Sequence, residues 1–365
     1  MKKHFYFLSL LLGLAISMTG FTSCCNDDDT TTPQQQPQVV TPSLNLDFAS
    51  IDPQFVVNGE DGEQYVQLTA GESLDIPFKV EPAELASQIV LTSSDPSIVV
   101  VEGMKLNALK AGRVTITAKA GELEKSFDVV VQKFVDRDEN GNLKISEINF
   151  PDERFRNKVK SFDKNSDGVL TDAEIAEVTS ISVNSSDIKT LEGIDFFTAL
   201  QSLECSSNQL TSLDLSKNTA LKYLYCGKNQ LTSLDVSKNT ALTELDCHKN
   251  QLTSLDVTKN TALTYLDCSS NQITSLDVSK NTNMKGLYCH SNKLTSLDVT
   301  KNTALEYLAC DDNQLTSLDL SKNSALKQLY CDNNQITSLD LSNNPKMSSS
   351  SLVCDDNVEV IWGKK

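Results

Sequence analysis

The chain has 365 residues, of which 49 are acidic and 32 are basic, so its formal net charge is −17. A strongly acidic surface repels nucleic acids, which excludes a nucleic-acid-binding function. Hydrophobic residues make up 39% of the chain, and a single stretch near the N-terminus is apolar enough to enter a membrane. This excludes a multi-pass membrane protein, and the low aromatic content of 6% favours a repetitive fold.

The first 23 residues have the organisation of an export signal peptide. Lys2 and Lys3 precede an apolar run, residues 5–16, that is too short to span a bilayer comfortably. The next string, Phe21-Thr22-Ser23-Cys24, resembles the lipobox of bacterial lipoproteins, with phenylalanine in place of the usual leucine. The resemblance implies that Cys24 is acylated and becomes the mature N-terminus. An ordinary secretory signal is the alternative.

A polar segment, residues 24–43, follows this signal. It is rich in proline and glutamine and cannot bury enough apolar surface to fold, so we expect a flexible tether. The acidic run Asp27 to Asp29 resembles segments that accompany display on the outer face of the cell in some bacterial lipoproteins. This resemblance implies a lipid-anchored protein of the outer membrane or cell surface.

Residues 44–133 alternate β-rich runs with turns, and this spacing predicts a small β-sandwich. The strings TAGESLDIPFKVEP, SSDPSIVVV and ALKAGRVTITAKAG resemble the group 2 bacterial Ig-like domain. Leu91 stands where that family often has a tryptophan, a difference that affects packing only. The resemblance implies a spacer module.

Residues 134–177 contain two loops with the spacing of an EF-hand, so we expect a small helical calcium-binding cap. Oxygen-bearing side chains occupy positions 1, 3 and 5, a glycine position 6 and a glutamate position 12, as one Ca²⁺ ion requires. The expected ligands are Asp163, Asn165, Asp167, Val169, Thr171 and Glu174 in the second loop and Asp136, Asp138, Asn140, Asn142 and Glu147 in the first.

The second loop follows an expected helix that begins at Pro151, whereas the first follows a strand, so a simple turn is the alternative there. Thr171 and Glu174 also fit a capping box, although a glutamate bound to the metal cannot also cap. Because extracellular sites of this kind bind at about 10⁻⁴ to 10⁻³ M, we expect a constitutive structural clamp.

A unit LxxLxCxxNxLTSLDxSKNTA recurs with a period of 21, which indicates a leucine-rich repeat solenoid. The seven copies start at Leu200, Leu221, Leu242, Leu263, Met284, Leu305 and Leu326. An earlier 22-residue unit from Val178 resembles the internalin type of repeat. We expect the solenoid over 178–346 and a C-terminal cap over 347–365, in which Val358, Val360 and Trp362 close the open end.

Several residue types recur at fixed repeat positions. One inward position holds Cys205, Cys226, Cys247, Cys268, Cys289, Cys310 and Cys331. Parallel side chains hold the β-carbons too far apart for disulfides, so we expect reduced, buried thiols. A column of asparagines beginning at Asn208 is expected to bond between successive turns. We interpret the aspartates from Asp214 and the lysines from Lys217 as a solvated face whose charges offset each other.

Sequence variation among the copies is confined to two positions that flank the inward leucine of the first half. Alternation along a strand turns both outward, onto the concave sheet of this repeat family. Six of the eight tyrosines of the chain lie there, and tyrosine gives a large contact area with few rotors. The expected ligand-binding residues are Tyr223, Tyr225, Tyr265, Tyr288, Tyr307, Tyr330, His248 and His290. Tyrosines merely tolerated on an exposed sheet are the alternative.

These features predict a monomeric, non-catalytic, cell-surface binding or adhesion protein. Its partners would be a protein or carbohydrate ligand and the membrane, and its cofactor Ca²⁺. A structural surface protein without a ligand is one alternative. A surface hydrolase with a site on the repeat face is the other, but no nucleophile motif or phosphate loop supports it. The metal site such an enzyme would need could come only from Asp246, His248 and Asp267.

Overall fold

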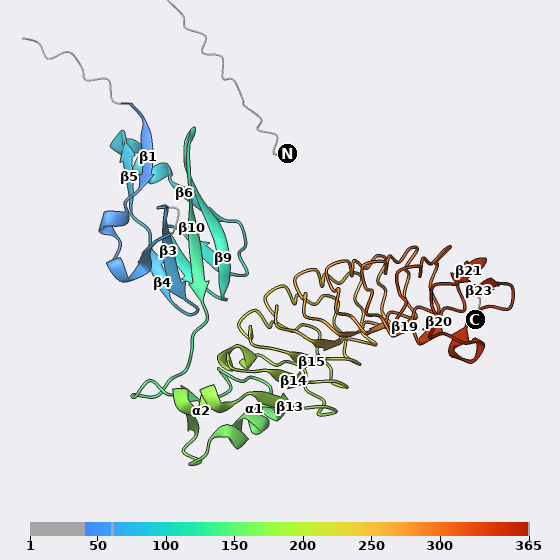
Figure 1. Ribbon diagram of the computed structural model, residues 1–365. Coiled ribbons are helices and arrows are strands. Elements are labelled where there is room, and N and C mark those ends of the chain that lie inside the picture. Colours follow the sequence, from blue (N-terminus) through green and yellow to red (C-terminus); the bar gives the residue numbers. More distant parts are fainter. Residues whose placement is uncertain (1–40, 60–61, 364–365) are drawn as a thin grey trace, which may run out of the picture. The chain divides into compact units, whose positions relative to one another are not determined.

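The computed structural model describes residues 41–59 and 62–363, and the chain divides into two compact units, Met1–Gln132 and Lys133–Lys365 (Figure 1). The predicted signal peptide, the lipidation site Cys24 and almost all of the predicted tether lie outside the described residues. Within the two described ranges, no helix is both long and apolar enough to cross a membrane.

The first unit is built from β-strands. Its largest sheet has the order β2-β3-β10-β9-β6, with bounds Val56–Asn58, Gln64–Thr69, Leu123–Gln132, Gly112–Ala120 and Val90–Ser93. A second sheet has the order β4-β8-β7, with bounds Ser73–Asp75, Lys105–Ala108 and Val99–Glu102. The remaining elements are the paired strands β1 (Ser43–Leu46) and β5 (Phe78–Glu81) and the short helices η1 (Phe48–Ser50), η2 (Pro53–Phe55) and η3 (Ala83–Gln88).

One hydrophobic core joins the sheets of this unit. In the long hairpin β9–β10, every second residue is buried from Val114 to Ala120 and from Phe127 to Val131. These side chains share a cluster with Leu106 of β8 and Val99 of β7. The period of two along each strand therefore places one face of each sheet in the core, as the alternating sequence predicts. Membership of the group 2 Ig-like family stays a prediction.

The second unit begins with a small helical segment. Its elements are β11 (Leu143–Lys144), α1 (Glu153–Val159), η4 (Lys160–Phe162), β12 (Val169–Leu170) and α2 (Asp172–Glu177). Helix α1 starts where Asp152 accepts hydrogen bonds from the backbone N–H groups of Arg154 and Phe155. Phe150 and Phe155 pack edge to face, and both are fully buried in the core that continues into the repeats. The segment therefore covers the first end of the solenoid.

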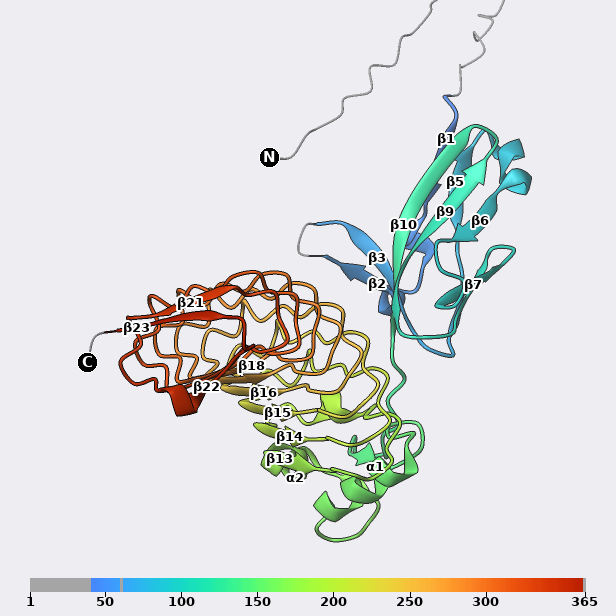
Figure 2. The ribbon, with the colours of Figure 1, turned by 90° about the vertical axis from the view of Figure 1, so that its right-hand side faces the viewer.

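The repeats form the predicted solenoid, with one short strand per turn in a nine-stranded parallel sheet (Figure 2). In spatial order the strands are β13 (Ser180–Ser182), β14 (Ser202–Glu204), β15 (Tyr223–Tyr225), β16 (Glu244–Asp246), β17 (Tyr265–Asp267), β18 (Gly286–Tyr288), β19 (Tyr307–Ala309), β20 (Gln328–Tyr330) and β22 (Leu352–Val353). The remaining elements of this unit are the strands β21 (Ser338–Leu341) and β23 (Glu359–Trp362) and the helices η5 (Ile194–Phe196) and η6 (Ser349–Ser351).

The interior of the solenoid contains the expected columns of cysteine and asparagine. The seven cysteines are buried, as predicted, and each is free in the structure. In the asparagine column, Asn229 donates to the carbonyls of Cys205 and Cys226, and its Oδ1 accepts from the N–H of Leu210. Each such side chain therefore joins two successive turns, as predicted.

A second asparagine column, which we did not predict, lies inside the repeated half-unit. It consists of Asn218, Asn239, Asn260, Asn281, Asn302, Asn323 and Asn344, all nearly or fully buried. Asn239, for example, donates to the carbonyls of Leu215 and Asn218, at 3.1 and 2.9 Å. This column satisfies backbone acceptors that the irregular half of each turn leaves unpaired.

One expectation about the solenoid was wrong in part. Trp362 does not close the open end, because it is 39% exposed, whereas Val358 and Val360 pack against the core. In the outer column, hydrogen bonds stabilise the aspartate carboxylates in addition to the lysine charges. Asp235 accepts from the N–H of Ser237 at 2.8 Å, and this contact lowers the pKa of the carboxyl more than the charge of Lys238 does.

Candidate ligand-binding and metal-binding sites

Two outward columns of side chains run along the parallel sheet. In each strand the central leucine is buried and the two flanking residues are partly exposed in most turns. Consecutive strands pair in register, so Tyr223 lies beside Glu244 and Tyr225 beside Asp246. The six predicted tyrosines therefore share one face, named here the tyrosine strip: Tyr223, Tyr225, Tyr265, Tyr288, Tyr307 and Tyr330.

Contacts within the strip hold several of these rings in place. The ring centroids of Tyr265 and Tyr288 lie 5.2 Å apart. The glycine at position 286 leaves room for both rings, because a β-carbon at Gly286 would be 3.2 Å from each of them. Tyr225 donates its hydroxyl to Glu244 at 2.5 Å. Burial and this contact raise the pKa of Tyr225, so its hydroxyl stays a hydrogen-bond donor. The strip therefore presents partly ordered rings with polar ends.

His248 lies on the same sheet face, in a group with two carboxylates. Its Nδ1 is 2.6 Å from Oδ1 of Asp246, and its backbone N–H donates to the same oxygen. Asp267, directly opposite Asp246 in the next strand, accepts from the N–H and hydroxyl of Ser269. The ligand atoms of Asp246, His248 and Asp267 all lie within 4.8 Å of one another.

His290 occupies the corresponding position two turns later, in a different environment. Tyr288 and Ala309 replace the two aspartates of the His248 group. The Nδ1 atom of His290 is buried without a hydrogen-bond partner, and Asp311 is the acidic neighbour that interacts with its ring. Burial raises the pKa of Asp311, because the carboxylate is partly removed from water. The structure therefore separates the two predicted histidines into unlike surroundings.

The second predicted calcium loop is compact and stabilised by its own carboxylates. Asp163 accepts from the N–H groups of Ser166 and Gly168, and both bonds are 2.8 Å long. Glu174 reaches back to accept from the N–H of Lys164 and, in a capping box, from the N–H of Thr171. These bonds lower the pKa of Glu174. The loop thus brings Asp163 and Glu174 to the same end, where position 1 and position 12 of a calcium loop meet.

The first predicted calcium loop is arranged differently. Glu147, expected at position 12, pairs with Arg156 at 3.2 Å and its side chain is 84% exposed. Asp136, expected at position 1, pairs with Lys144 at 3.0 Å. Asp138 accepts from the N–H groups of Asn140 and Asn142. This geometry favours the alternative of a simple turn, because protein cations already neutralise two of the expected ligands.

The two loops are nevertheless joined by a short antiparallel ladder. Leu143 pairs with Leu170, and Lys144 pairs with Val169. Both leucines are fully buried, so position 8 of each loop packs inward. Any ligand that orders the second loop would therefore also act on the first.

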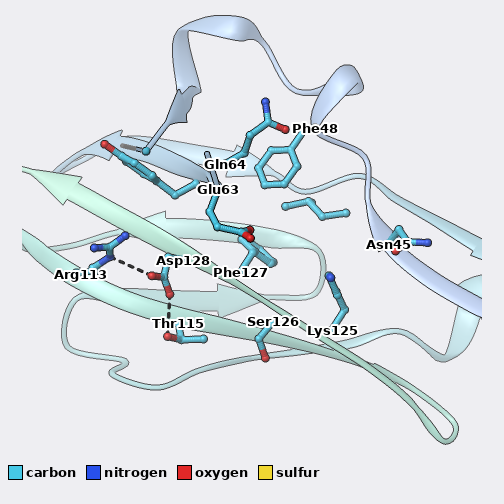
Figure 3. Close-up of a pocket in the computed structure, with 13 residues that line it drawn as sticks. Asn45, Phe48, Glu63, Gln64, Arg113, Thr115, Lys125, Ser126, Phe127 and Asp128 are labelled. Atoms are coloured by element: carbon cyan, nitrogen blue, oxygen red, sulfur yellow. Dashed lines mark hydrogen bonds and ion pairs between the residues drawn. The ribbon is translucent and has the colours of Figure 1, made fainter. Parts of the chain in front are cut away.

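A cavity of the first unit has a volume of about 860 Å³. Two of its charged residues pair with each other: Arg113 binds Asp128 at 3.0 Å, and Thr115 donates to the same carboxylate at 2.9 Å (Figure 3). The sequence analysis did not predict this cavity, and we assign no function to it.

Comparisons with known proteins agree with the repeat geometry. Residues 198–239, 219–260, 240–281 and 261–302 each match the family described as Leucine Rich repeats (2 copies). Internalin J of Listeria monocytogenes serotype 4b (strain F2365) is 44% identical over 71 residues, which is 19% of this chain and 8% of that protein. The chain thus spans only a small part of this relative.

Two solved structures resemble the second half of the chain. Internalin C2 from Listeria monocytogenes is 24% identical, with a TM-score of 0.56, over 60% of this chain and 100% of that one. The functional domain of InlJ from the same species, described as including a cysteine ladder, is 32% identical with a TM-score of 0.39 over 59% of this chain and 60% of that one. The chain therefore contains leucine-rich repeats, and the fold of this part is similar to that of internalin C2.

Proposed function

We propose that this protein is a non-catalytic surface protein that binds a protein ligand through the tyrosine strip. One observation carries the proposal: six tyrosines from five turns lie on a single face of the parallel sheet. Three of them, Tyr223, Tyr307 and Tyr330, are 37–39% exposed. Tyrosine is enriched in protein interfaces because its rigid ring gives contact area at low entropic cost.

The chemistry of the strip favours a protein ligand over a carbohydrate. Its rings alternate with carboxylates such as Glu244 and Asp267, and the chain carries a net charge of −17. A basic protein surface would complement this face and would be steered toward it. A purely structural protein without a ligand has no need for tyrosines gathered on one face.

The remaining parts of the chain would serve display and rigidity. In this proposal Cys24 carries a lipid that anchors the protein in the outer membrane, and the first unit is an Ig-like spacer. The loop from Asp163 to Glu174 binds a structural Ca²⁺ ion. Mass spectrometry of membrane-extracted protein should then find a lipid on an N-terminal Cys24, and release of a Cys24→Ser variant from the membrane would support the same conclusion.

A binding experiment tests the proposed ligand surface. The wild-type chain and a variant with Tyr225→Ala, Tyr265→Ala and Tyr288→Ala are applied to arrays of purified extracellular proteins and of polysaccharides. We expect binding on the protein array that weakens at least tenfold, or about 1.4 kcal/mol, in the variant, because it removes the best-ordered rings.

A matched control replaces three exposed lysines of the outer column, Lys238, Lys259 and Lys280, by alanine, and should bind normally. Circular dichroism checks that both variants are folded. Unchanged affinity in the tyrosine variant would place the ligand on another face, and binding confined to the polysaccharide array would replace the protein ligand by a glycan.

A further inference from the structure

We propose that Asp246, His248 and Asp267 form a site for a divalent transition-metal ion, with Zn²⁺ as the best match. Each residue offers one ligand atom, and these atoms lie within 4.8 Å of one another. Zinc binds imidazole nitrogen and carboxylate oxygen at about 2.0–2.2 Å in a tetrahedron, so ligand atoms on one ion lie about 3.3–3.6 Å apart. Side-chain rotations that bring the ligand atoms closer by up to about 1.5 Å would therefore complete the set.

The two aspartates form an acidic pair that the protein itself does not neutralise. They are direct neighbours in register on β16 and β17, about 4.8 Å apart along the sheet. In the described part of the chain, neither forms an ion pair with a lysine or arginine, and the one cationic partner is the imidazole of His248 when protonated. The two negative charges repel each other at this spacing, and a divalent cation bound between them would attract both and outweigh that repulsion.

One oxygen of each carboxylate is left available. Asp246 uses Oδ1 for both of its contacts with His248, and Asp267 uses Oδ1 for both of its contacts with Ser269. Within the described residues, Oδ2 of each therefore has no hydrogen bond. The contact from Ser269 would fix the orientation of Asp267 as a ligand while leaving an oxygen for the metal.

The preceding turn makes room for the histidine. Gly227 occupies the repeat position of His248, one turn earlier, and a β-carbon there would be 2.3 Å from Nδ1 of the ring. Its backbone does not have a positive φ angle, so the conformation alone does not require glycine. The lack of a side chain at Gly227 therefore leaves the space that the imidazole of His248 occupies. The side chain of His248 is 22% exposed, and that of Asp246 is 20% exposed.

The donor set selects the metal. Imidazole favours zinc and its transition-metal neighbours, whereas all-oxygen sets favour calcium and magnesium. The thiols of the interior do not compete, because Cys247 and Cys268 are fully buried. Three protein ligands leave one zinc position open, on the same face as the tyrosine strip. The proposal does not depend on the protein ligand proposed above.

Calorimetric titration of the full chain with ZnCl₂ tests this site, with 1 mM CaCl₂ present to saturate any calcium loop. We expect one Zn²⁺ ion per chain in the wild type and at least tenfold weaker binding in His248→Ala and in Asp267→Asn. Gly227→Ala should weaken binding similarly while keeping all three ligands. His290→Ala is the matched control, because its turn lacks both aspartates, and it should bind as the wild type does.

Circular dichroism of each variant confirms that the solenoid is folded. Zinc binding of wild-type strength in the double variant His248→Ala and Asp267→Asn would overturn the proposal and assign the ion to another part of the chain. Absence of zinc heat in the folded wild type would also overturn it. Displacement of zinc by millimolar Ca²⁺ would show instead a general cation site of the acidic sheet.

Discussion

At the scale of single residues, the cysteine column makes the solenoid sensitive to alkaline pH. Burial raises the pKa of the Cys205 thiol from 9.0 to about 12, and the thiols of the turns that follow are raised in the same direction. A buried thiolate would lose its hydration without gaining a partner. The column is therefore stable only as neutral thiols, which act as small apolar side chains.

We predict that the second unit loses stability as the pH rises above about 9. Unfolded thiols lose their protons near pH 9.0, whereas folded Cys205 keeps its proton to about pH 12. The unfolded state therefore binds fewer protons in this window, and each thiol lowers the free energy of unfolding by about 1.4 kcal/mol per pH unit. Urea unfolding between pH 7 and 10.5 measures this slope.

The matched variant for this prediction is Cys205→Ala, which should show a shallower slope by the contribution of one thiol. Buried tyrosines such as Tyr265 titrate in the same direction, but they are common to both proteins and cancel in the comparison. Equal slopes would mean that Cys205 ionises as readily in the folded state as in the unfolded one.

At the level of residues, prediction succeeded for positions that have the same environment in every repeat. It failed for positions whose role depends on contacts with a neighbouring turn. The cysteine column and the Asn208 column follow from periodicity alone, because an inward position must be apolar or satisfied. The Asn218 column was missed, since it lies in a nearly invariant half-unit that shows no contrast between copies. The roles of Gly227 and Gly286 were also missed, because these glycines make room for side chains such as His248 and Tyr265 in adjacent turns.

At the scale of elements, the segment from α1 to α2 couples a loop to a helix end. Glu174 accepts from the N–H of Lys164 in the loop and from the N–H of Thr171 at the start of α2. Without metal, this carboxylate therefore serves as a helix cap. A bound Ca²⁺ ion would take over the carboxylate and exchange the cap for coordination.

We predict that Ca²⁺ stabilises the second unit through this loop. With a dissociation constant of about 10⁻⁴ M, 1 mM Ca²⁺ should add roughly 1.4 kcal/mol to the free energy of unfolding. Calorimetry should detect one ion, lost in Glu174→Gln. Glu147→Gln is the matched control in the first loop, and it should retain wild-type affinity because Glu147 already pairs with Arg156. The absence of binding heat in the wild type would refute the assignment.

Element-level prediction was accurate for the repeats and weaker at their ends. Each turn of the solenoid places its strand at the varied positions, as the alternation around the inward leucine predicts. At the C-terminus the aromatic side chain of Trp362 suggested a plug, but β23 pairs with β21 and leaves it half exposed. Sequence pattern does not show which face of β23 is covered, because this strand lies outside the 21-residue period that fixes the inward positions of the repeats.

At the scale of the whole molecule, each unit has a hydrophobic core of its own. The core of the first unit is made from its β-sheets and includes Leu68. The core of the second unit runs without interruption from Leu143 to Met347, so the helical segment and the repeats form one body. In such a solenoid, each turn contacts mainly its neighbours, and stability depends on an unbroken series of interfaces.

We predict that the two units unfold as separate transitions in scanning calorimetry. Leu68→Ala and Leu245→Ala form a matched pair, because both side chains are nearly or fully buried and each removal should cost about 2–5 kcal/mol. Leu68→Ala should lower the melting temperature of the first unit alone, and Leu245→Ala, in the middle of the solenoid, that of the second alone. If either substitution shifted both transitions equally, the two cores would have to be stabilising each other across the boundary at residue 132.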